Sequence, residues 1–196
     1  MQLVAFINMA HLLCHYCLLI LPTAVLAMAV RDGAFGAEYG PVLELATAMF
    51  VLYGLLSLPQ GWLAARFGRR AMIAAYFFGT GAALVAASLT RTPLALELAL
   101  AAAGAFAAIY HPVGTAMLVE AAGDRPGRAL GTNGVCGNVG VALAPVVTAA
   151  LASRFGWPVA FAAPGLVFVA LGVAWLRLPA AGPATSGAIR PFAAIP

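Results

Sequence analysis

The chain has 196 residues, of which 64% are hydrophobic and only 8% are charged, with a net charge of +4. Soluble domains carry about 25% charged residues, so this composition excludes an ordinary water-soluble fold and predicts that lipid surrounds most of the chain. All ten basic residues are arginines. They stand singly or in small groups at the ends of apolar runs, so we expect no nucleic-acid-binding groove.

Six apolar runs are long enough to cross a bilayer as helices, which requires about 20 residues each, whereas barrel strands need only about ten. We therefore predict an all-α polytopic membrane protein. Residues 1–178 form its six-helix transmembrane domain, and residues 179–196, rich in Pro, Ala and Gly, form an unstructured cytoplasmic tail. In chain order the predicted spans are Leu3–Val30, Pro41–Leu63, Ala71–Leu89, Pro93–Val119, Ala129–Ser153 and Pro158–Leu176.

The first run is longer than a bilayer requires, so it tilts, kinks at Pro22 or overhangs the membrane. A cleaved signal peptide that ends near Ala27–Ala29 is an alternative interpretation of this run. We favour a true span, because no basic residues precede the run and it exceeds the usual apolar length of a signal peptide.

The arginines predict the orientation of the helices. With both termini in the cytoplasm, seven arginines face the cytoplasm and three face outward, as the positive-inside rule requires. We therefore expect an integral protein of a bacterial-type plasma (inner) membrane. The seven cytoplasmic arginines are Arg66, Arg69, Arg70, Arg125, Arg128, Arg177 and Arg190.

Glycines are frequent inside the spans. Helices in lipid approach each other closely over stripes of small residues, so we interpret these glycines as packing positions. No strand precedes them, which makes a nucleotide-binding loop implausible. The stripes comprise Gly79 and Gly81 in the third span, and Gly131, Gly134, Gly137 and Gly140 in the fifth.

The first span carries four polar or ligand-forming side chains on one helix face. Asn8, His11, Cys14 and His15 are three or four residues apart, and this spacing places them side by side. Polar groups are costly at membrane depth. We therefore expect this face to look into the helix bundle or onto a water-filled path rather than into lipid.

Later spans add His111, Asn133 and Asn138, and three interpretations compete for the histidines. Imidazole titrates near neutral pH, so the histidines can carry protons and bind substrate on a transport path. With a neighbouring cysteine they could instead bind a metal ion, or they could simply form interhelical hydrogen bonds. We predict a substrate and proton pathway at His11, His15, His111 and Asn138, with no bound metal or other cofactor. No intramembrane aspartate and no Gly-x-Ser-x-Gly motif occur, so we expect no enzyme.

An arginine-rich segment, which we predict to be a tight turn over residues 61–70, separates the second and third spans. It resembles the loop between the second and third helices of major facilitator superfamily transporters. Ala65 stands where that pattern has an acid. The resemblance implies that the three arginines gate the cytoplasmic side of a transport path. The matching residues are Gly61, Arg66, Gly68, Arg69 and Arg70.

Further motifs resemble the fosmidomycin-resistance-type drug exporters of that superfamily, and the resemblance covers about Asn8 to Leu178. His15 stands where that group often has aspartate. The matching positions are His11, Pro22, Tyr110-His111-Pro112-Val113-Gly114, Gly127-Arg128-Ala129, Gly137-Asn138-Val139-Gly140 and Pro145.

The resemblance implies a twelve-helix bundle made of two six-helix halves, each built from two inverted three-helix repeats, with substrate bound between the halves. The six predicted spans supply one half. A second six-helix half or a second copy of the chain is then the expected partner, together with the lipid bilayer and a small-molecule substrate. The implied function is secondary active transport, in the form of proton-coupled efflux of a small organic solute or drug. The alternative is a truncated, non-transporting membrane subunit or remnant.

Overall fold

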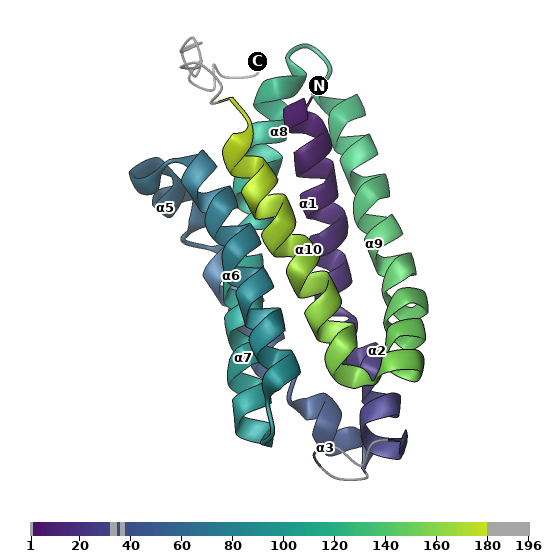
Figure 1. Ribbon diagram of the computed structural model, residues 1–196. Helices are drawn as coiled ribbons and strands as arrows, with labels where there is room; N and C mark the ends of the chain where they lie inside the picture. Colours follow the sequence, from purple (N-terminus) through teal and green to yellow (C-terminus); the bar gives the residue numbers. More distant parts are fainter. Residues whose placement is uncertain (1, 32–34, 36–37, 180–196) are drawn as a thin grey trace, which may run out of the picture.

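The computed structural model describes residues 2–31, 35 and 38–179, and all regular elements in this part of the chain are helical. Six helical stretches are long and apolar enough to cross a membrane, which confirms the predicted fold class (Figure 1). Apart from Pro179, the predicted tail lies outside the described residues. The stretches are Gln2–Ala29, Tyr39–Ser57, Arg69–Leu89, Pro93–Ala122, Pro126–Phe155 and Trp157–Arg177.

Several spans are made of more than one helical piece. In chain order the elements are α1 (Gln2–Leu18), α2 (Ile20–Leu26), the π-helical turn η1 (Ala27–Arg31), α3 (Tyr39–Glu44), α4 (Thr47–Ser57), α5 (Gln60–Phe67), α6 (Arg69–Leu89), α7 (Pro93–Ala107), the π-helical turn η2 (Tyr110–Gly114), α8 (Thr115–Ala122), α9 (Pro126–Phe155) and α10 (Trp157–Arg177).

The α-helix of the first span is interrupted just before Pro22. Proline has no N–H to donate to the carbonyl of Leu18, and its ring crowds that carbonyl. The α-helix accordingly breaks at Leu19, whose backbone has φ −102° and ψ 2°. The Leu19 N–H instead donates to the carbonyl of Tyr16 at 3.1 Å. A kink at Pro22 is one of the three alternatives predicted for the first run, and the structure interrupts the helix at this place.

The arginine-rich segment is not the tight turn that the sequence predicts. Most of it belongs to helix α5, which starts after Pro59 and runs from Gln60 to Phe67. Nothing between Trp62 and Phe67 disfavours a helix, so the chain leaves helical geometry only at Gly68, where φ is +84°. The predicted turn is therefore wrong over most of its length, and the second span ends earlier than predicted, at Ser57.

Glycines let the main helix pairs approach closely. Helix α6 packs against α10, where a Cβ on Gly81 would meet the carbonyl oxygen of Gly165, and α1 packs against α9 across Gly140. The predicted packing role is therefore confirmed for Gly81 and Gly140. Gly131 and Gly134 have no neighbour within 4 Å of an added Cβ, so the structure gives them no such role.

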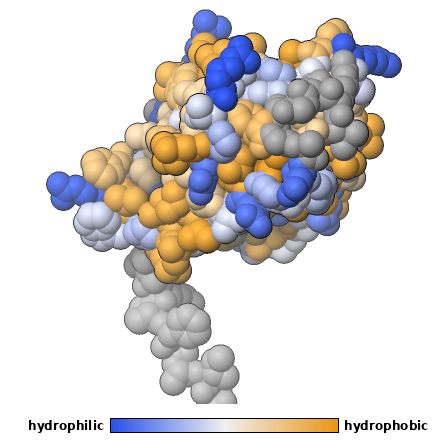
Figure 2. Space-filling view, turned by 90° about the horizontal axis from the view of Figure 1, so that it is seen from below, coloured by the Kyte–Doolittle hydropathy of each residue, from blue (hydrophilic) through white to orange (hydrophobic). Residues whose placement is uncertain are grey.

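The outer surface of the bundle is largely apolar, as a lipid environment requires. Large hydrophobic side chains such as Leu55, Val135 and Val146 are exposed along the helices. At the end opposite the N-terminus, hydrophobic side chains lie among scattered hydrophilic groups (Figure 2). Two spans are covered least by the rest of the bundle: 17% of the Tyr39–Ser57 stretch and 28% of α9 are buried, against 61% of the first span. Their free faces are available to lipid or to another helical unit.

Candidate functional site

All three histidines of the chain meet at one place in the bundle. His11 and His15 come from α1, and His111 comes from the turn η2, about 100 residues later. Their ring nitrogens lie within 4.8 Å of one another. The ring centroids are 4.8 Å apart for His11 and His15, and 5.0 Å apart for His11 and His111. We call these three residues the histidine cluster.

Local sequence explains how each ring reaches this position. One helical turn separates His11 from His15, which stacks their side chains on the same face of α1. Pro112 cannot donate an N–H, and the helix widens there into the π-helical turn Tyr110–Gly114. In this turn Tyr110 is buried and His111 is half-buried. Single π turns recur at functional sites.

Hydrogen bonds fix the proton positions of two rings when the cluster is neutral. The Nδ1–H of His11 donates to the backbone carbonyl of Asn133, at 2.7 Å. A neutral imidazole has one N–H, so the Nε2 of His11 then carries a lone pair. The Nε2 of His15 lies 3.0 Å from that atom and donates to it. The result is a short chain of hydrogen bonds from His15 through His11 to α9.

Asn133 organises the side of the cluster that faces α9. Its amide nitrogen lies 2.9 Å from the side-chain oxygen of Asn8 and 2.9 Å from the hydroxyl of Tyr110. The Tyr110 hydroxyl donates in turn to the carbonyl of Ile7, at 3.1 Å. The Tyr110 ring stacks on His11, with 5.0 Å between centroids and 21° between planes. These contacts hold the His11 ring from two sides.

Asn138 does not join this network, although the sequence favours it as a pathway residue. It is exposed on α9, whereas Asn133 is 4% exposed. Five residues turn an α-helix by about 140°, so the two amides point in different directions. The buried face of α9 is the one that carries Asn133, Gly137 and Gly140, at helical spacing. In the sequence, this spacing from the two glycines indicates that Asn133, rather than Asn138, lies on the buried face.

The other side chains near the cluster carry no charge. Tyr53 from α4 lies 6.3 Å from the His111 ring, measured between centroids. Cys14 is fully buried, and its sulfur lies 3.8 Å from the Tyr53 hydroxyl and 3.9 Å from the carbonyl of Ala107. Cys14 therefore packs away from the imidazoles and does not extend the cluster.

The arginine-rich segment lies at one end of the bundle and makes different contacts at each arginine. Arg69 forms an ion pair with Glu120 of α8. Arg66 is exposed, with its guanidinium carbon 5.8 Å from the centre of the adjacent Phe67 ring. Gly61 is also exposed, and Gly68 provides the break between α5 and α6.

Arg70 has a structural role inside this bundle. Its guanidinium donates to the carbonyls of Trp175 and Leu176 at 3.2 and 3.1 Å, in the last turn of α10, where carbonyls lack their usual helical N–H partners. The Trp175 indole N–H donates back to the carbonyl of Arg70, at 3.0 Å. Arg70 thus joins the start of α6 to the end of α10.

Replacing Arg70 with alanine is expected to lower the free energy of unfolding by about 1–3 kcal/mol, because the carbonyls at the end of α10 lose a charged donor. Thermal unfolding in detergent measures the change. Arg66→Ala removes the same group from the same segment without these contacts, so it is the matched control. Equal losses of stability in the two variants would contradict the capping role of Arg70.

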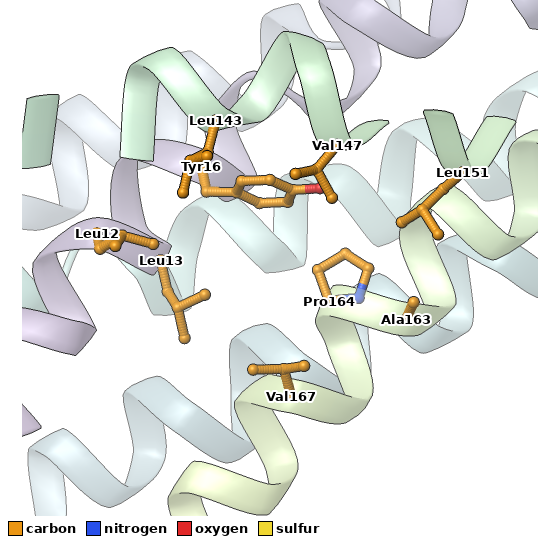
Figure 3. A pocket seen from close by; sticks show the side chains of 9 residues that line it. All are labelled: Leu12, Leu13, Tyr16, Leu143, Val147, Leu151, Ala163, Pro164 and Val167. Atoms are coloured by element: carbon orange, nitrogen blue, oxygen red, sulfur yellow. The ribbon is translucent and has the colours of Figure 1, made fainter. Parts of the chain in front are cut away.

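A separate apolar pocket of about 260 Å³ lies between α1, α9 and α10 (Figure 3). Its polar feature is Tyr16, whose hydroxyl accepts a hydrogen bond from Thr148 at 3.1 Å. None of the residues predicted to line the pathway borders this pocket. The pocket is lined by Leu12, Leu13, Tyr16, Leu143, Val147, Leu151, Ala163, Pro164 and Val167.

The sequence was compared with models of known protein families. The model of the Major Facilitator Superfamily matches residues 9–194. The chain belongs to the Major Facilitator Superfamily. Members of this superfamily are membrane transporters rather than enzymes, so the predicted class of function is confirmed. The six spans are consistent with half of a major facilitator fold. A search of the curated proteins finds no match.

Proposed function

We propose that this major facilitator protein is a proton-coupled secondary transporter that exports a small organic solute or drug. The observation that supports this proposal is the histidine cluster. All three imidazoles of the chain gather on two spans of a membrane bundle, and two of them stay half-buried. Ionisable side chains inside a membrane are costly, and they mark substrate and ion pathways.

The cluster suits the handling of one proton at a time. His15 and His11 already share a hydrogen bond between their Nε2 atoms, so a proton added at either ring has an acceptor beside it. A second positive charge on a ring about 5 Å away would be repelled. The groups that lie against the cluster are Tyr53 from α4, Tyr110 from η2 and Asn133 from α9, and none of them is a carboxylate. The imidazoles are therefore the groups of the cluster that would take up and release the proton.

A partner would complete the pathway. The spans with the least covered faces include α9, and Asn138 is exposed on that helix. A second six-helix half, or a second copy, that covers this face would bring Asn138 onto the same path as the cluster. The drug-exporter part of the proposal rests on the resemblance of the sequence motifs to those of fosmidomycin-resistance-type exporters.

We propose that both termini lie in the cytoplasm of a bacterial-type inner membrane. The N-terminus, the arginine-rich segment and the end of α10 all lie at the same end of the bundle (Figure 1). Arginine density favours the cytoplasmic side for that end. Arg66 and Arg69, which do not cap α10, would then change partners as the two halves rock, and Arg70 would stay with α10.

The proposal is tested in proteoliposomes that contain the purified full chain and a pH-sensitive dye. Wild-type protein should move protons when fosmidomycin or another candidate drug is added, and His11→Ala and His111→Ala should each reduce the rate at least about tenfold, since proton transfer by a placed group is worth roughly 10²–10⁴-fold in enzymes. Unaltered transport and pH dependence in both variants would contradict the role of the histidine cluster in proton transfer. A wild-type monomer that transports nothing would favour the non-transporting alternative.

A further inference from the structure

We propose that the histidine cluster is a binding site for one divalent transition-metal ion, with His11, His15 and His111 as the three protein ligands. The inference does not depend on the proposed proton coupling, because a chain that transports nothing can still bind the ion. Zn²⁺ is the probe that matches the ligand set most closely.

The chemistry of the ligands selects the class of metal. Three imidazole nitrogens are an established set for zinc sites that keep a fourth position open. Imidazole also suits Cu, Ni and Co ions, whereas Mg²⁺ and Ca²⁺ require oxygen ligands. The potential ligands that come together in the histidine cluster are histidines alone, because Cys14 is turned toward Tyr53 and Ala107. A transition-metal ion is therefore favoured over a hard cation.

The distances are close to those of a bound site. Zn–N bonds of about 2.0–2.1 Å at tetrahedral angles place two ligand nitrogens about 3.3 Å apart. The Nε2 atoms of His11 and His15 are already 3.0 Å apart. The three ligand nitrogens lie within 4.8 Å of one another, so closing the widest gap to the bound spacing takes about 1.5 Å, which a movement of the His111 ring can supply. Its side chain is half-buried, which leaves room for that adjustment.

The surroundings of His11 resemble the supporting shell of a metal ligand. Metal-binding histidines almost always donate their second ring N–H to a carbonyl or carboxylate, which fixes the other nitrogen as the ligand. His11 does this through Nδ1 and the Asn133 carbonyl, at 2.7 Å. Tyr110 stacks on the same ring and limits its rotation. The His11 Nε2 is thus aimed into the cluster, and its lone pair, which accepts the hydrogen bond from His15 in the absence of an ion, can bind a metal once the His15 proton moves to Nδ1.

His111 distinguishes a metal site from a purely structural set of hydrogen bonds. His11 and His15 bond to each other, but within the described part of the chain no hydrogen bond is recorded for the His111 ring. The ring nevertheless lies edge-on to both partners, with centroids 5.0 and 5.4 Å away. A third imidazole held against two others, with its nitrogens unused, is what a third ligand requires.

The test is a Zn²⁺ titration of the full chain, purified in detergent through an affinity tag without histidine and stripped of metal. We expect one Zn²⁺ per chain. Co²⁺ should give the visible absorption of a tetrahedral site, and Zn²⁺ should abolish it. His15→Ala and His111→Ala should each weaken binding by more than the roughly 10–100-fold loss that follows when a ligand loses its hydrogen-bond partner.

Cys136→Ser is the matched control, because Cys136 is the one cysteine that is not fully buried and it lies outside the cluster. Its affinity should equal that of the wild type. Absence of saturable binding to the wild type would overturn the proposal, and so would wild-type affinity in His111→Ala or loss of binding in Cys136→Ser. A symmetric size-exclusion peak shows that each variant is folded, and His111→Asn provides a second variant of similar size. Because the titration measures no transport, its failure leaves the proposed proton coupling standing.

Discussion

Replacing Asn133 with leucine is expected to lower the free energy of unfolding by about 2–4 kcal/mol, since two polar groups in the interior of the bundle each lose a hydrogen bond. Leucine has a similar branched shape, so the change mainly removes polarity. The side chain of Asn133 connects Asn8 on α1 with the Tyr110 hydroxyl in η2. Both groups are left with one hydrogen bond fewer in a region where water is scarce.

The matched control is Asn138→Leu, on the same helix and with the same chemistry. Asn138 is exposed, so its loss should leave the free energy of unfolding nearly unchanged. Thermal unfolding of both variants in one detergent gives the comparison. Equal destabilisation, or a larger effect at position 138, would show that the network around Asn133 does not hold α1, η2 and α9 together.

The six spans could be predicted from the sequence because the membrane leaves few alternatives. Each backbone polar group in lipid must be satisfied within its own helix, so a sufficiently long apolar run is almost certain to be a span. The residues at which helices begin and end are less strictly determined by the membrane. Arginines between two apolar runs suggested a loop over residues 61–70, yet Pro59 and Gly68 are the residues that interrupt the helix, and the sequence between them is helix α5.

The site was predictable only in part. Helical spacing places His11 and His15 on one face from sequence alone. The approach of His111 depends on how η2 packs against α1, and periodicity within one helix carries no information about the neighbouring helix. The choice between Asn133 and Asn138 likewise depends on which face of α9 is buried. The glycines at positions 137 and 140 indicate that face, because a small residue is required where another backbone comes close.

Valine at position 140 is expected to separate α1 from α9 and to cost about 3 kcal/mol or more, at the upper end of the range for overpacked cores. A Cβ on Gly140 would overlap the carbonyl group of Leu12. A flexible side chain could move aside, but this neighbour is the backbone of α1. Because α1 carries His11 and His15, a displacement here also pulls two imidazoles away from His111.

Gly134→Val provides the control, because an added Cβ there has no neighbour within 4 Å. Both substitutions put the same β-branched residue into the same helix, so their intrinsic helix propensities cancel. The difference between the two unfolding temperatures therefore reports the contact between α1 and α9. If both variants unfold at the same temperature, the close approach at Gly140 does not hold the helices, and the position of the histidine cluster must depend on the Asn133 network instead.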